Sequence, residues 1–123
     1  MKRILIAAAL LLTAAPAHAE WKSLGEWRVT GYCACRKCCG KSDGVTADGT
    51  RAKAAREIIL SAPKGIPFGA RVWIDGVGEA VVHDRGGAIR GHRMELLFPS
   101  HRQAKAWGVQ KRMLFLWAPS APP

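Results

Sequence analysis

The stretch "VVHDRGGAIRGHRMELLF", residues 81–98, has the pattern of two strands joined by a loop and contains two candidate catalytic acids. Asp84 closes an apolar run, and a glycine-rich loop follows it. Apolar runs bounded by such loops are typical of strands, so we expect one strand at 78–84 and another at 92–98. Glu95 lies inside the second strand. If the two strands are neighbours, both carboxylates face one cleft.

Short strands separated by turns continue over the rest of the chain. Four segments combine apolar, β-branched or aromatic residues with flanking turn residues: 27–32, 58–61, 71–76 and 111–117. One segment has helix signals, because Ser100 is a candidate N-cap, Gln103 follows as in a capping box, and Gly108 ends the pattern. The sequence therefore predicts a small, mostly β barrel or sandwich with one short helix.

The N-terminus has the pattern of a secretory signal peptide. Lys2 and Arg3 precede an apolar run at 4–15, and an Ala-x-Ala motif ends at Ala19. That run is shorter than the about 20 residues that a membrane-spanning helix needs. We expect cleavage, a secreted or periplasmic location and no membrane anchor. The expected organisation is a signal peptide at 1–19, one domain at 20–118 and a disordered tail at 119–123.

The chain is strongly basic, with a formal net charge of +10 that falls to +8 when Lys2 and Arg3 leave with the signal peptide. A basic surface favours an anionic polymer. In the cytosol that polymer is first of all nucleic acid, whereas an exported protein meets cell-wall glycan with its acidic peptides and anionic lipid headgroups. We therefore expect a monomer that binds the cell wall and no nucleic acid.

All four cysteines lie in "GYCACRKCCG", residues 31–40. Export makes disulfides the default. Pairing of the neighbours Cys38 and Cys39 would need a strained ring, which leaves Cys33 with Cys38 and Cys35 with Cys39, or Cys33 with Cys39 and Cys35 with Cys38. The rival is a zinc site built from the four thiols, but four ligands within seven residues wrap an ion awkwardly. We expect disulfides and no metal; either way the cluster is structural.

The surroundings of Glu95 act on its carboxyl group in opposite directions. The flanking Met94 and Leu96 are apolar, and a carboxyl group held against apolar surface tends to stay protonated, as a general acid for glycosidic cleavage requires. Three nearby positive charges favour the ionised form instead: Arg85, Arg90 and Arg93. Patterning alone favours a simpler reading, in which an aspartate caps a turn and a glutamate pairs with an arginine.

Several motifs together resemble the three-aspartate (3D) domain family, which is related to the catalytic barrel of membrane-bound lytic transglycosylase A. They are "TGYCACRKCCG", "GVTADGTRA", "IPFG", "DRGGAIRG" and "FPSHRQAKAWG". The likeness covers roughly residues 29–117. It implies a six-stranded double-psi β-barrel that acts on peptidoglycan outside the cytoplasm. Members look like lytic transglycosylases, which cut between N-acetylmuramic acid and N-acetylglucosamine and leave a 1,6-anhydro end.

The resemblance also implies roles for single residues. The three family aspartates fall at Ala62, Asp84 and Glu95. The third position is the acid/base of the related enzymes, and Asp84 is expected to orient the substrate or stabilise developing positive charge. No cofactor is implied. The candidate substrate-binding residues are Thr46, which matches a family threonine, with Asp48, Gly86, Gly87, Arg90 and His92. The paired glycines have no side chains, so a ligand can lie against the backbone there.

Two departures from the family pattern keep other functions open. Ala62 lacks a carboxylate, which favours a wall-binding barrel without catalysis. Glu95 is one methylene longer than aspartate, and a displacement of about 1 Å can cost on the order of a hundredfold in rate. A third possible function is metal binding or redox chemistry, which would depend on the cysteine cluster.

Overall fold

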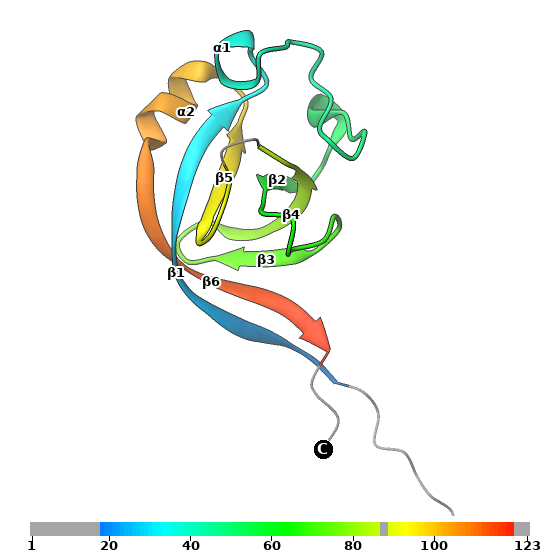
Figure 1. The fold of residues 1–123 in the computed structure, drawn as a ribbon, viewed down its shortest axis with the longest axis vertical. Helices are drawn as coiled ribbons and strands as arrows, with labels where there is room; N and C mark the ends of the chain where they lie inside the picture. Colours follow the sequence, from blue (N-terminus) through cyan, green and yellow to red (C-terminus); the bar gives the residue numbers. More distant parts are fainter. Residues whose placement is uncertain (1–17, 87–88, 120–123) are drawn as a thin grey trace, which may run out of the picture.

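The computed structural model describes residues 18–86 and 89–119. The chain forms a closed barrel with the strand order β1-β5-β2-β4-β3-β6 (Figure 1). The strands are β1 (Ala19–Cys33), β2 (Ile58–Ser61), β3 (Arg71–Ile74), β4 (Gly78–Asp84), β5 (Arg93–Phe98) and β6 (Val109–Pro119). The helical segments are α1 (Arg36–Cys39), a single turn, η1 (Ala52–Ala54) and α2 (His101–Trp107). The predicted class, a mostly β six-stranded barrel with one short helix, is confirmed.

Some expectations concern residues outside the two described ranges. They are the signal peptide as far as residue 17, Gly87 of the paired glycines, and the tail from residue 120. Strand β6 continues to Pro119. Within the described ranges, the helices lack the length and apolar character needed to cross a bilayer.

The strand pairing has an internal two-fold relation. Exchanging β1 with β4, β2 with β5 and β3 with β6 turns the parallel pair β1–β5 into the parallel pair β4–β2. The same exchange turns the antiparallel pair β1–β6 into β4–β3, and it leaves the antiparallel pairs β2–β5 and β3–β6 unchanged. The barrel therefore consists of two interlocked three-stranded halves, which is the predicted double-psi arrangement. Its middle strands, β2 and β5, lie side by side.

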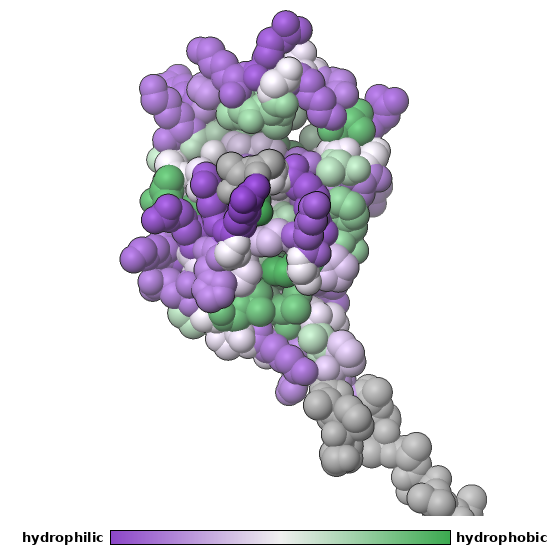
Figure 2. Space-filling model, in the orientation of Figure 1, coloured by the Kyte–Doolittle hydropathy of each residue, from purple (hydrophilic) through white to green (hydrophobic). Residues whose placement is uncertain are grey.

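The core fills the barrel with alternate residues of each strand, as the two-residue period of a β-strand requires. In β5, Met94 and Leu96 are buried among the aliphatic residues of the other strands. Glu95 lies between them in sequence and so projects from the opposite face of the strand. Hydrophilic residues gather over the upper part of the face drawn in Figure 2.

Helix α2 packs against the outside of β1 at Gly31. A Cβ atom on this residue would lie 2.4 Å from the carbonyl oxygen of Ala104, so no larger residue fits without displacing the helix. Trp107 Nε1 donates a hydrogen bond of 2.9 Å to the carbonyl oxygen of Val29. The predicted N-cap is confirmed, because Ser100 Oγ accepts a hydrogen bond of 3.2 Å from the Gln103 backbone N–H. These contacts hold the middle and the end of α2 against β1.

Candidate functional site

A pocket of about 190 Å³ lies where the ends of β1, β2 and β4 meet β5. Both predicted acids, Asp84 and Glu95, line it, and so do Thr46 and Gly86. The other lining residues include Tyr32 and Cys39 near the end of β1, Ser61 at the end of β2, and Arg85 after β4. The structure thus brings together the two carboxylates, the matched threonine and the first glycine of the loop.

The two acids do not lie on neighbouring strands; β2 separates β4 from β5. Ser61, the last residue of β2, pairs with Asp84 on one side and with Glu95 on the other. A register shift after Leu60 brings Asp84 rather than His83 opposite Ser61, as β-bulges do when they redirect a side chain. Ser61 is buried, and its hydroxyl has no hydrogen-bond partner among the described residues. The residue lines the pocket, but its hydroxyl oxygen is not exposed to solvent.

Three hydrogen bonds fix the carboxylate of Asp84. Its Oδ2 accepts a bond of 2.8 Å from the Tyr32 hydroxyl. Its Oδ1 accepts bonds of 2.9 Å from the backbone N–H groups of Ala47 and Arg85. Burial, aided by the Asp84 charge, raises the pKa of Tyr32, so this hydroxyl keeps its proton and remains a donor. Asp84 is thus a rigid negative charge that ties together β1, the loop containing Ala47 and β4.

Burial changes the pKa of the Glu95 carboxyl group more than the neighbouring arginine does. Its side chain is 19% exposed, and burial raises the pKa of the carboxyl group. The charge of Arg93, whose Nη2 lies 3.5 Å from Glu95 Oε1, lowers this pKa, and the Asp84 charge raises it further. The guanidinium of Arg85 instead donates to the carbonyl oxygens of Ala62 and Ile66. The net direction is upward, as a general acid requires.

Gly86 lies close to Glu95. A Cβ atom on residue 86 would lie 3.6 Å from Glu95 Oε2 and 2.7 Å from Cγ1 of the buried Ile89. Only a glycine therefore fits here without displacing its neighbours. Ala62, which we expected at the first family aspartate position, is fully buried in the core, and it is not among the residues lining the pocket.

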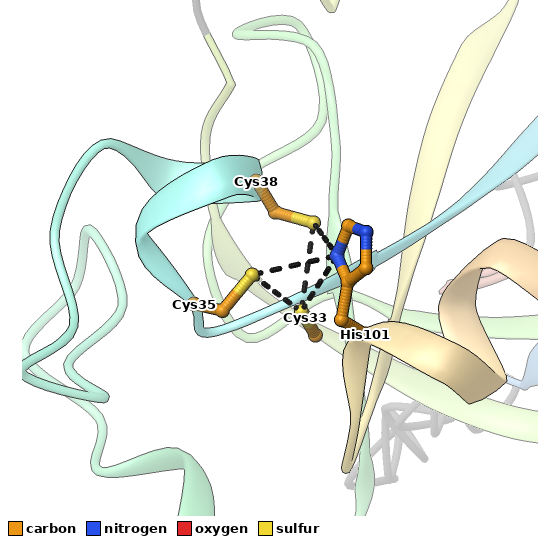
Figure 3. Close-up of side chains that lie close together, drawn as sticks. All are labelled: Cys33, Cys35, Cys38 and His101. Atoms are coloured by element: carbon orange, nitrogen blue, oxygen red, sulfur yellow. Dashed lines mark hydrogen bonds between the residues drawn. The ribbon is translucent and has the colours of Figure 1, made fainter.

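The cysteines are free thiols in the structure. The Cys33 and Cys35 sulfurs lie 2.9 Å apart, well beyond the about 2.05 Å of a disulfide bond. Figure 3 shows both beside Cys38 and His101. A hydrogen bond from Cys33 is the main reason that the pKa of Cys35 falls to about 6, whereas burial raises the pKa of Cys33 to about 12. Cys39 instead lines the pocket and donates to the carbonyl oxygen of Cys33.

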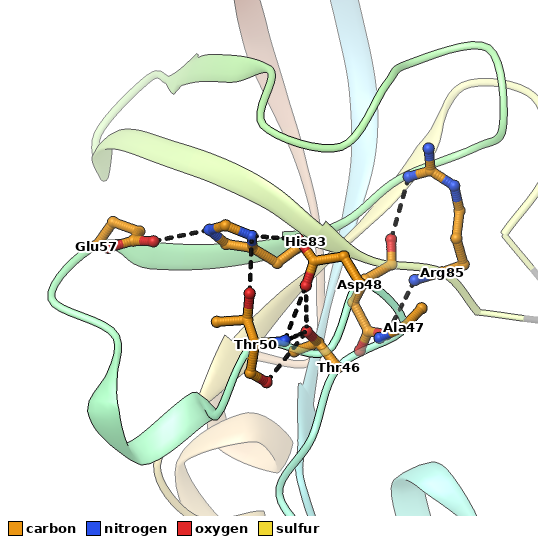
Figure 4. Close-up of polar contacts among 8 residues, drawn as sticks. Thr46, Ala47, Asp48, Thr50, Glu57, His83 and Arg85 are labelled. Carbon is orange, nitrogen blue, oxygen red and sulfur yellow. Dashed lines mark hydrogen bonds and ion pairs between the residues drawn. The ribbon is translucent and has the colours of Figure 1, made fainter.

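Asp48 belongs to a separate polar network (Figure 4). Its Oδ1 accepts a bond of 2.8 Å from the Thr46 hydroxyl, and its Oδ2 lies 2.6 Å from His83 Nδ1. The other ring nitrogen of His83 lies 2.7 Å from Glu57 Oε1. Burial alone would lower the pKa of His83, but these carboxylates outweigh it and raise the pKa. Asp48 does not line the pocket and holds the loop that carries Thr46.

Arg90 and His92 line a second hollow on the barrel. The His92 ring stacks on Trp27, with the ring centroids 4.8 Å apart. The cations around this hollow are Arg28, Arg90, Arg93 and Lys111. Arg93 connects the two places, since it lines the hollow and also contacts Glu95. The two predicted residues thus belong to a basic surface beside the acid pocket.

Comparison with known proteins gives a family and two relatives. Residues 61–118, from the end of β2 through β6, match the model of the 3D domain. The chain is 38% identical over 73 residues to the cell wall-binding protein YocH of Bacillus subtilis (strain 168), a match that covers 58% of this chain and 25% of YocH. It is 32% identical over 89 residues to the putative cell wall shaping protein YabE of the same organism, covering 71% of this chain and 22% of YabE.

These matches confirm the resemblance predicted from the motifs, since residues 61–118 match the 3D domain. Both Asp84 and Glu95 lie within the matched range. The chain spans about a quarter of the length of each of these two relatives.

Proposed function

We propose that this protein acts on peptidoglycan glycan strands and cleaves them as a lytic transglycosylase. Glu95 gives its proton to the oxygen that leaves C1 of N-acetylmuramic acid as the glycosidic bond breaks. The resulting carboxylate takes the proton of the 6-hydroxyl of the same sugar, whose oxygen bonds to C1 and closes the 1,6-anhydro ring. The proton and bond changes balance without water or a cofactor.

The observation that carries this proposal is the state of Glu95. Burial raises the pKa of its carboxyl group in a pocket open to solvent, although an arginine lies 3.5 Å away. A carboxyl group with a raised pKa keeps its proton to a higher pH than an ordinary glutamate does, as a general acid requires. The same side chain on an exposed strand would be ionised and a poor acid.

Neighbouring groups support the same reaction. Glycosidic cleavage passes through a transition state with positive charge on the sugar ring. The fixed carboxylate of Asp84 would stabilise that charge. Thr46 and Gly86 complete the binding surface of the pocket, and the basic hollow with Arg90 and His92 would hold the anionic wall polymer.

The cellular setting forms part of the proposal. The printed names of YocH and YabE both refer to the cell wall. In this account, residues 1–19 are removed on export, and residues 20–118 act as one monomeric domain without a membrane anchor, secreted or in the periplasm.

A second function, glycan binding without cleavage, has its own support. Ala62 has no carboxylate, and YocH is named as a cell wall-binding protein. The basic hollow is consistent with either function.

Digestion of purified sacculi in ¹⁸O-labelled water separates the functions. A lytic transglycosylase should release muropeptides that end in anhydro sugars, lack one water and carry no label at the new end. Labelled reducing ends would show a hydrolase and would contradict the proposed reaction. Co-sedimentation of the protein with sacculi, with no release of fragments, would support the second function, glycan binding without cleavage.

A further inference from the structure

Three cysteines and a histidine converge outside the acid pocket. Cys33 lies at the end of β1, Cys35 and Cys38 lie at and within α1, and His101 is the first residue of α2. Their ligand atoms all lie within 4.8 Å of one another. Figure 3 shows the four side chains pointing toward a common centre. The fourth member comes from a segment far along the chain, so the awkward wrapping of one ion by four adjacent cysteines does not arise.

The distances between these atoms resemble the edges of a tetrahedron around zinc. With Zn–S of about 2.3 Å and Zn–N of about 2.0–2.1 Å, sulfur and nitrogen ligands lie about 3.6 Å apart. The sulfurs of Cys33, Cys35 and Cys38 lie 3.7, 3.5 and 3.4 Å from His101 Nδ1. The Cys33 and Cys38 sulfurs lie 3.5 Å apart, near the about 3.8 Å expected between two sulfur ligands. The Cys33 and Cys35 sulfurs, 2.9 Å apart, are closer than this and would separate when the ion binds. One nitrogen thus faces three sulfurs at nearly equal distances.

The geometry points to a structural zinc site formed by Cys33, Cys35, Cys38 and His101. Three thiolates and one imidazole complete a closed tetrahedral set of the kind found in structural zinc sites, with no open position for a substrate. The three thiols release their protons when the ion binds. Cys39 is not a ligand, since its sulfur donates to a backbone carbonyl and lines the pocket. The site differs from the disulfide pairing expected from the sequence.

The ion would attach α1 to two elements, β1 and α2, that already pack against each other. It would connect α2 to the end of β1 through His101 and hold α1, a single turn with no buried residue. Cys38 also lines the acid pocket, so the zinc site would fix one wall of that pocket. Because the ion binds the folded chain, it stabilises the fold.

Native mass spectrometry and metal analysis of the exported protein test this site. We expect one zinc per chain, and a denatured mass that corresponds to four free thiols. The variant His101→Ala should bind zinc at least about a hundredfold more weakly in competition with a chelator, since even a change next to a ligand costs about 10–100-fold. The matched controls Cys39→Ser and His92→Ala should keep the affinity of the unchanged chain.

Two results would overturn the zinc site. One is a denatured mass lower by two or four hydrogens with no zinc bound, which would show disulfides. The other is unchanged zinc affinity in His101→Ala. The variant His101→Cys replaces imidazole by a thiolate and should restore zinc binding, which separates loss of a ligand from loss of the fold. None of these measurements depends on whether the protein cleaves glycan.

Discussion

Replacing Glu95 by glutamine should reduce the release of anhydro-muropeptides from sacculi by about a hundredfold or more. The amide keeps the shape of the side chain but cannot donate and recover a proton, and general acid–base catalysis contributes typically about 10²–10⁴-fold. The measurement is the initial rate of fragment release at equal protein concentration.

The matched control is Glu79→Gln. Glu79 is a glutamate of β4 that pairs with Arg71 at the surface, so its loss removes one exposed ion pair. Such pairs contribute about 0–1 kcal/mol to stability, and the rate should stay within about twofold. A folded Glu95→Gln variant that digests sacculi as fast as this control would contradict the assignment of the acid.

Glu95→Gln should not destabilise the protein at neutral pH. The pKa of Glu95 is raised in the fold, so the folded state holds this proton more tightly than the unfolded chain does. Stability from this group is present below the unfolded pKa and is lost as the pH rises through the folded pKa. The uncharged amide avoids that loss. The melting temperature of the variant at pH 7 should therefore equal or exceed that of the unchanged protein, which separates a lost proton donor from a lost fold.

Asp84→Ala should have the second large effect, on both stability and activity. The carboxylate accepts hydrogen bonds from Tyr32, Ala47 and Arg85, and its removal leaves three donors without this acceptor. Since a bond to a charged group contributes about 1.5–3 kcal/mol and these groups are partly exposed, we expect a loss of about 2–4 kcal/mol in the free energy of unfolding. Urea denaturation measures this loss.

Asp84→Asn separates the structural role of this residue from its charge. Its carbonyl oxygen can accept the two backbone bonds, and its amide can donate to the Tyr32 hydroxyl, so most of the stability should remain. The digestion rate should still fall, because the negative charge beside the sugar is gone. Asp75→Ala is the control, since Asp75 is an exposed turn residue. Equal stability of Asp84→Ala and this control would show that the three bonds do not anchor the loop.

Much of the barrel could be predicted from local patterns. The strand at 78–84 agrees with β4, the one expected at 92–98 begins one residue later in β5, and the N-cap at Ser100 is confirmed. The first strand was less predictable, since it begins at Ala19 rather than at Trp27. Its first residues pair with the end of β6, and a partner so distant in sequence leaves no local signal.

The candidate site could be predicted only in part, because topology decides it. Consecutive strands usually pair, which suggested contact between the strands carrying Asp84 and Glu95, but β2 lies between them. Ser61 was therefore missed, although a polar residue ending the apolar run "IILS" was a signal. No spacing rule links His101 to cysteines more than sixty residues away. The sequence likewise does not show whether burial or Arg93 has the larger effect on the pKa of Glu95, because this depends on their distances in the fold.

The proposed mechanism requires the fold to raise the pKa of the Glu95 carboxyl group above its usual value. Titration of ¹³C-labelled glutamate side chains by NMR measures this directly, with the Glu95→Gln spectrum identifying the resonance. We expect a Glu95 pKa clearly above the usual 4.5. A pKa at or below that value would show that Arg93 outweighs burial and would contradict Glu95 as the acid.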